Sequence, residues 1–325
     1  MPTLLKRILP WVFSLAIVGY LFWSVDREAV LSAMERADIA TMLGLIAAFS
    51  VLILFADAGT LWVLFKRLLG PLTFRDVLAI KGLSYFLNAI TYSAGTGGIA
   101  YLAHRRGSVS FLKALSVLLW LNFADIIALI VMMSAGAVLA ADVLPADVKA
   151  QVPMVLTIGW LIIIGALIYW RLGINFLILG PCRSWRIFSA FGDAELRDYV
   201  VMVGLRICFI GIYVLLGWLL LPTFDITIEL ETLLIYMPII TFVQIIPASI
   251  SGLGAVQVVI IALYAPHVMS HVADPAAQVL AFSTVIGPAT TLVRIAIGYC
   301  FMQYLTDEFR VDPDAIEALR DEHDG

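Results

Sequence analysis

The chain has 325 residues, of which 62% are hydrophobic and 14% are charged, and its formal net charge is −4. Soluble domains carry about a quarter charged residues, so this composition excludes an ordinary soluble protein and indicates an integral membrane protein. The three cysteines have no CxxC spacing, and the chain has no nucleotide-binding motif. We therefore expect no cofactor and no nucleic-acid partner.

Apolar stretches long enough to cross a bilayer recur along the chain. A spanning helix needs about 20 residues, and the predicted spans are 8–24, 39–65, 111–141, 153–170, 199–221 and 276–305. The first span follows Lys6 and Arg7 and has no small-residue cleavage site behind it. We expect it to be an uncleaved helix rather than a signal peptide.

Two further apolar regions are broken by glycine or proline. Region 77–93 runs into the glycines at 95–98, and region 232–265 is interrupted between 247 and 254. Residues 86–98 align without a gap on residues 242–254, with Phe, Asn or Gln, Ile, Ser and the last Gly in register. Broken backbone at membrane depth must be buried in protein or line a wet cavity, so we expect two re-entrant, broken-helix hairpins.

The distribution of basic residues predicts the orientation. If 77–93 enters and leaves on the cytoplasmic side and 232–265 on the other side, most of the 20 Lys and Arg residues are cytoplasmic, and so are both termini. The predicted fold is an all-α integral membrane protein with an inverted-topology repeat, 8–141 and 153–305. It forms one transmembrane domain, 1–306, followed by an acidic cytoplasmic tail, 307–325. The alternative is two unrelated bundles with ordinary glycine-kinked helices.

Five charged residues lie inside the hydrophobic segments. An ionised group there costs several kcal/mol unless it is paired or hydrated, so each is a candidate functional residue. Asp57 and Arg206 stand at similar depths in corresponding helices, and so do Asp125 and Arg294. One interpretation is two structural ion pairs between the halves. The other is that Arg206 or Arg294 receives a phosphate, with Asp57 or Asp125 as counter-ion or proton-coupling group. We expect Lys81 to extend toward the cytoplasmic surface.

The hairpins supply polar groups without charge. If each places a half-helix N-terminus near the midplane, its N–H groups add partial positive charge there, which suits phosphate. The alternative is that the glycines only allow tight packing. The candidate substrate-binding residues are Asn88, Ser93, Gly97, Gly98, Arg206, Gln244, Pro247, Ser249, Gly252, Gly254, Gln257 and Arg294. The spacing of His267 and His271 suits a metal, but neither has a Cys or carboxylate framework, so we expect no metal site.

Two stretches resemble a known family. The stretch from Gly97-Gly98 to Asp125, with Arg105-Arg106-Gly107, resembles the first signature of the lysylphosphatidylglycerol synthase transmembrane region, and 246–254 resembles its second. That family includes the flippase-like domain of bacterial multiple peptide resistance proteins. The pattern differs where members carry charge. Family Glu and Arg residues are replaced at Gly98, Tyr101, Gln257 and near Gly287.

The resemblance implies translocation of an amphipathic, phosphate-bearing lipid across the bacterial cytoplasmic (inner) membrane. The expected partner is a membrane lipid, either an anionic phospholipid or a polyprenyl-type lipid, and a homodimer is left open. The tail after Thr306 is too short for a soluble aminoacyl-transferase domain, so we expect lipid movement rather than aminoacylation, and no enzyme activity. The rival functions are a membrane enzyme or accessory subunit acting on lipid intermediates of glycan-carrier or hopanoid type, and an ion-coupled small-solute transporter.

Overall fold

The computed structural model describes residues 27–70, 72–90, 92–107, 109–139, 144–172, 185–245 and 255–304. Helices dominate these ranges, in which the only strand-like pairing is an isolated bridge between Ile226 and Val268. The predicted span 8–24 and the acidic tail 307–325 lie outside the described residues.

Five helices in the described ranges are long and apolar enough to cross a membrane. Each coincides with a predicted span, which confirms the all-α membrane class. The five are α3 (Ile39–Leu68), α6 (Phe111–Leu139), α7 (Ala146–Leu172), α10 (Leu196–Leu220) and α13 (Pro275–Tyr304).

Polar residues fix where the long helices begin. At the start of α3 the Asp38 carboxylate accepts a hydrogen bond from the backbone N–H of Thr41 at 3.0 Å. At the start of α10, Glu195 and Asp198 form a capping box, in which Asp198 accepts from the backbone N–H of Glu195 at 2.8 Å. Such caps satisfy backbone N–H groups that the first helical turn leaves unpaired. The start of each of these two helices is therefore fixed by polar residues that flank its apolar stretch.

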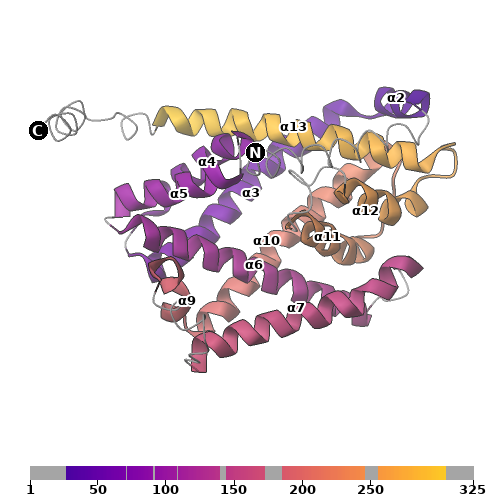
Figure 1. Ribbon diagram of the computed structural model, residues 1–325. Coiled ribbons are helices and arrows are strands. Elements are labelled where there is room, and N and C mark those ends of the chain that lie inside the picture. The colour runs from indigo at the N-terminus through magenta and orange to yellow at the C-terminus, as the bar shows by residue number, and fades with distance from the viewer. Residues whose placement is uncertain are drawn as a thin grey trace, which may run out of the picture.

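The first broken region forms a helical hairpin. Helices α4 (Phe74–Ile90) and α5 (Tyr92–Gly107) lie side by side (Figure 1). The end of α5 returns to the start of α4, where an Arg106 guanidinium nitrogen donates to Asp76 at 2.5 Å. The start of α4 and the end of α5 therefore lie together at one end of the bundle, whereas their re-entry into the membrane stays a prediction. The membrane side on which that end lies stays a prediction.

A second helix pair opens toward the opposite end. Helices α11 (Leu230–Ile245) and α12 (Ala255–Tyr264) pack together, and their outer ends meet where the N–H of Thr227 donates to the carbonyl of His267 at 3.1 Å. Helix α10 leads from the first end to this one, because an ion pair between Asp198 and Arg67 holds its start beside the end of α3. The break itself, 246–254, lies outside the described residues.

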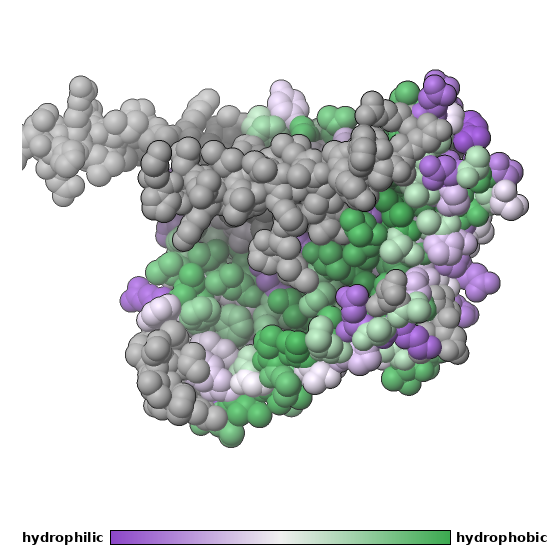
Figure 2. All heavy atoms as spheres, turned by 45° about the vertical axis from the view of Figure 1, so that its right-hand side comes forward, coloured by the Kyte–Doolittle hydropathy of each residue, from purple (hydrophilic) through white to green (hydrophobic). Residues whose placement is uncertain are grey.

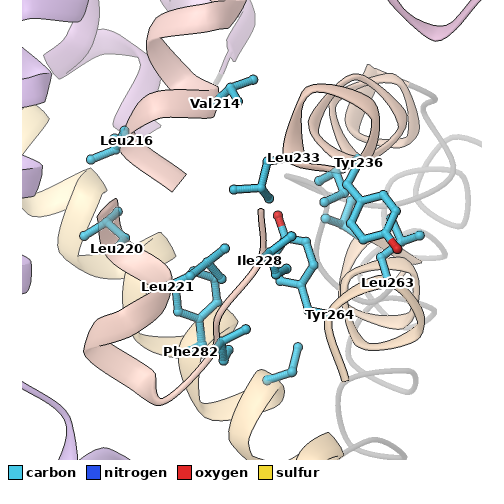
Figure 3. Close-up of a cluster of buried hydrophobic side chains, with 14 of the residues drawn as sticks. Val214, Leu216, Leu220, Leu221, Ile228, Leu233, Tyr236, Leu263, Tyr264 and Phe282 are labelled. Atoms are coloured by element: carbon cyan, nitrogen blue, oxygen red, sulfur yellow. The ribbon is translucent and has the colours of Figure 1, made fainter. Parts of the chain in front are cut away.

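The buried apolar side chains form two cores. The first core contains side chains from the first half of α3 and from the second half of α10. It also contains side chains from α11, from α12 and from the first half of α13. Its aromatic centre appears in Figure 3, where the Tyr236 and Tyr264 rings stack at 6.3 Å and Tyr264 meets the edge of Phe282. The second core joins the second half of α3 with α4, α5 and the first half of α6.

Large apolar side chains also cover the outside. Helix α7 lies at the edge of the bundle in Figure 1, and its Leu161 and Ile162 are 66% and 62% exposed. Figure 2 shows broad green areas of apolar side chains, with the purple hydrophilic residues gathered mainly toward the right-hand edge. An apolar surface of this extent suits contact with lipid rather than with water.

Candidate functional site

Four charged side chains from four helices meet inside the bundle, and we call them the charge cluster: Asp57 of α3, Lys81 of α4, Asp125 of α6 and Arg206 of α10. Arg206 donates from Nη1 to Asp57 at 2.9 Å and from Nε to Asp125. The other oxygen of Asp57 receives Lys81 Nζ at 2.7 Å. The four side chains are only 10–21% exposed. Each carboxylate therefore faces a cation directly.

The charge cluster lies where the two apolar cores meet. On α3, Asp57 stands between Ile53 of the first core and Leu61 of the second. On α10, Arg206 stands between Met202 of the second core and Phe209 of the first. The cluster is thus the polar layer that separates two apolar halves. A buried ion pair repays its desolvation only when its geometry is good and its remaining groups are bonded. Here Arg206 bonds both carboxylates, and Lys81 bonds the second oxygen of Asp57.

The charges within the cluster balance. It contains two carboxylates and two cations, and both oxygens of Asp57 are engaged. The guanidinium of Arg206 also lies over the Phe209 ring, 4.1 Å from its centroid, which adds a cation–π contact. The cluster is therefore electrostatically complete without a ligand.

A second cation lies apart from the cluster. Arg294 of α13 donates from Nη2 to the hydroxyl of Tyr213 at 2.8 Å, and its guanidinium carbon is 5.4 Å from the centroid of the Tyr85 ring. No described carboxylate forms an ion pair with it, and its Nε is buried without a hydrogen-bond partner in the described part of the chain. We call Arg294, Tyr85 and Tyr213 the Arg294 site.

The two groups share two helices. On α4, Lys81 and Tyr85 are four residues apart and therefore lie on one face. On α10, Arg206 and Tyr213 are seven residues apart on one face, with Phe209 between them. The rings of Phe209 and Tyr213 meet at 5.2 Å. The same faces of α4 and α10 therefore present the charge cluster and, two turns along α10, the Arg294 site.

Two predictions about these charges are wrong. Depth alone paired Asp125 with Arg294, but in the structure Asp125 bonds Arg206, which also holds Asp57. Lys81 was expected to extend to the cytoplasmic surface, but it is held inward by Asp57 at 2.7 Å. A carboxylate within reach offers the ammonium group a partner that it would otherwise seek in water.

The hairpin candidates that the structure describes differ in their surroundings. Asn88 is exposed at the tip of α4, where its carboxamide covers Gly95 of α5. Gly98 packs beneath Leu87, and Gly97 borders open space. Gln244 is exposed at the end of α11, whereas Gln257 of α12 is 8% exposed. The remaining candidates, namely the Ser93 side chain, Pro247, Ser249, Gly252 and Gly254, lie outside the described residues.

Sequence reasoning missed both tyrosines and the partnership of Lys81. The available signal was spacing, because Tyr85 follows Lys81 by four residues and Tyr213 follows Arg206 by seven.

The two loop histidines have separate neighbours. His267 meets the hydroxyl of Tyr236 at 3.3 Å, and His271 lies 3.7 Å from the Asp225 carboxylate.

Long apolar helices that enclose a buried charge cluster define a multi-pass helical membrane protein. A family model, the lysylphosphatidylglycerol synthase TM region, matches residues 7–298. The chain belongs to that family, as the resemblance predicted. Curated proteins give no match.

Proposed function

We propose that the protein translocates an amphipathic, phosphate-bearing lipid between the two leaflets of the bacterial cytoplasmic membrane. Family membership supports movement or handling of lipid. The observation that carries the proposal is that one buried cation, Arg294, lacks a carboxylate partner among the described residues. Within the described part of the bundle, the charge cluster is neutral and Arg294 has no carboxylate partner. A cation buried without a counter-ion favours an anionic ligand.

The same charges weigh against the rival functions. An enzyme acting on lipid intermediates would need a base or a nucleophile inside the bundle, and the two candidate acids, Asp57 and Asp125, are both bound by cations. An ion-coupled small-solute transporter would suit a sealed polar cavity. The charges here instead form a thin layer between apolar cores, within helices whose outer faces are apolar. We therefore favour a transporter of lipid over an enzyme.

Translocation is tested in vesicles that contain the purified protein. A fluorescent phosphatidylglycerol is placed in both leaflets, and a membrane-impermeant quencher reports exchange between them. The wild type should exchange the label, and Arg294→Gln should reduce the rate. Arg197→Gln is the matched control, because it removes an exposed cation at the start of α10. A wild-type rate no higher than that of protein-free vesicles rejects the proposal.

The inverted repeat and the sidedness belong to the same proposal. The two hairpins open toward opposite ends of the bundle, which supports an inverted arrangement. The test uses cysteine labelling in intact cells after Cys182, Cys208 and Cys300 are replaced by serine. A cysteine at Arg105 or Arg186 should be protected from an impermeant thiol reagent, and one at Asp274 should react. Labelling at Arg105 would place α4 and α5 across the membrane instead.

A further inference from the structure

Two buried hydrogen-bond donors at the Arg294 site have no acceptor. The Tyr85 side chain is 5% exposed, and neither its hydroxyl nor the Nε of Arg294 has a hydrogen-bond partner in the described ranges. Buried polar groups without partners are few in native proteins, and each costs about 1–3 kcal/mol. Two of them on neighbouring side chains therefore indicate an acceptor that binds between them.

The chemistry of the donors selects the acceptor. Arg294 uses only Nη2 in a described hydrogen bond, to Tyr213, so the edge of the guanidinium that carries Nε is available. Guanidinium groups bind carboxylates and phosphates through paired N–H donors, and a tyrosine hydroxyl can donate to a further oxygen of the same group. A tetrahedral phosphate offers several acceptor oxygens and the negative charge that Arg294 lacks.

Tyr213 and Tyr85 have different roles at the Arg294 site. Tyr213 accepts the Nη2 hydrogen at 2.8 Å and so fixes the rotation of the guanidinium. Tyr85 stands on α4, with its ring centroid 5.4 Å from the guanidinium carbon. The face of the Tyr85 ring stabilises the Arg294 cation, and the Tyr85 hydroxyl has no described acceptor and can donate to a ligand. Tyr213 is therefore a positioning residue, and Tyr85 and Arg294 are the contacts.

We propose that Arg294 and Tyr85, oriented by Tyr213, bind the phosphate group of an anionic lipid between α4, α10 and α13. The choice of a lipid as the source of that phosphate rests on the proposed function, whereas the oxyanion site itself rests on the two unpartnered donors. The charge cluster is not the binding site, because each of its cations already forms an ion pair with a carboxylate of the cluster.

Binding is measured by thermal shift of the purified protein in a non-ionic detergent. Three probes separate the sources: short-chain phosphatidylglycerol, the matching diacylglycerol without phosphate, and inorganic phosphate. Phosphatidylglycerol should raise the unfolding temperature of the wild type, and diacylglycerol should not. Protection by inorganic phosphate at equal concentration would assign the site to a free oxyanion; protection by the lipid alone assigns it to a headgroup.

Single-atom changes test the contacts. Tyr85→Phe should weaken phosphatidylglycerol binding about tenfold, because a hydrogen bond to a charged group is lost. Its ligand-free unfolding temperature should not fall, since the deleted hydroxyl had no partner. Tyr264→Phe is the matched control in the first core, where the hydroxyl donates to the sulfur of Met237 at 3.4 Å. It should keep the wild-type affinity.

The outcomes separate this inference from the proposed function. Affinity that is equal in the wild type, Tyr85→Phe and Arg294→Gln overturns the oxyanion site, and leaflet exchange by the same preparations would leave translocation standing. Affinity that depends on both residues in a protein that does not exchange lipid retains the site and rejects translocation.

Discussion

The charge cluster and the Arg294 site are built on the same faces of α4 and α10, yet they differ in completeness. In the cluster, each cation meets a carboxylate, and both oxygens of Asp57 are used. At the Arg294 site, a cation meets two tyrosines, and two donors remain unpaired. Burial alone therefore does not identify a binding residue. The distinction lies in whether the protein itself supplies the counter-charge.

The largest effect is expected from breaking the cluster. Arg206→Gln removes the only described cation bonded to Asp125, while Asp57 keeps Lys81. A buried charge left without its partner costs about 3–5 kcal/mol, so the variant should unfold at a clearly lower temperature in detergent. An unfolding temperature equal to that of the wild type would show that the cluster does not hold the helices together.

A double-mutant cycle tests whether the cost comes from the stranded carboxylate. Arg206→Gln combined with Asp125→Asn leaves two neutral side chains of similar size that can still hydrogen-bond. The double variant should be more stable than Arg206→Gln alone by up to about 3 kcal/mol, as coupled contacts allow. If the two losses simply add, Arg206 and Asp125 do not act as a pair, and the ion pair in the structure has no energetic weight.

The helices could be predicted from the sequence, but the pairing of charges could not. Length and hydropathy give the position of a residue along its helix, and this was enough to place Asp57, Asp125, Arg206 and Arg294 inside the bundle. It does not give the rotation of a helix or its neighbours. Helix α13 lies chiefly against α4, whereas α6 lies against α10, so Asp125 faces Arg206. Arg294 consequently meets tyrosines.

The hairpins illustrate the same limit. The glycine breaks predicted a re-entrant hairpin at 77–93; α4 and α5 do lie side by side, whereas their re-entry into the membrane stays a prediction. They did not indicate which polar side chains would lie beside the charges. Asn88 instead covers Gly95 within its own hairpin, while Tyr85, one turn earlier on α4, is directed to Arg294. An amphipathic tyrosine in an apolar run carries no distinctive signal in a single sequence.

An intermediate effect is expected where α13 meets α4. A Cβ added at Gly298 would lie 2.6 Å from the backbone nitrogen of Phe86, the residue next to Tyr85. Gly298→Ala should therefore cost about 1–3 kcal/mol through overpacking. It should also weaken phosphatidylglycerol binding, because the two helices that carry Tyr85 and Arg294 are forced apart.

Gly204 on α10 provides the control for that change. It is exposed and a Cβ there meets nothing within 4 Å, so Gly204→Ala should leave stability unchanged or raise it by about 0.4–1 kcal/mol. Thermal unfolding of the two variants side by side separates close helix contact from the general effect of replacing a helical glycine. Equal behaviour of the two variants would mean that α4 and α13 do not approach closely in the membrane protein.

A small effect on stability is expected at Arg294, the residue that we propose as the main phosphate contact. Arg294→Gln removes one hydrogen bond to Tyr213 and a cation–π contact, which costs stability. It also removes a buried cation that has no carboxylate partner in the described residues, which relieves a desolvation penalty. The two terms oppose each other, so the net change should be about 1 kcal/mol or less.

This small cost should accompany a large loss of phosphatidylglycerol binding and leaflet exchange. Arg206→Gln should show the reverse order, with a large loss of stability. The measurement is the ratio of the two losses in each variant, taken on the same preparations. Should Arg294→Gln destabilise the protein as much as Arg206→Gln does, Arg294 has a structural partner, and the surplus cation on which the proposed function depends does not exist.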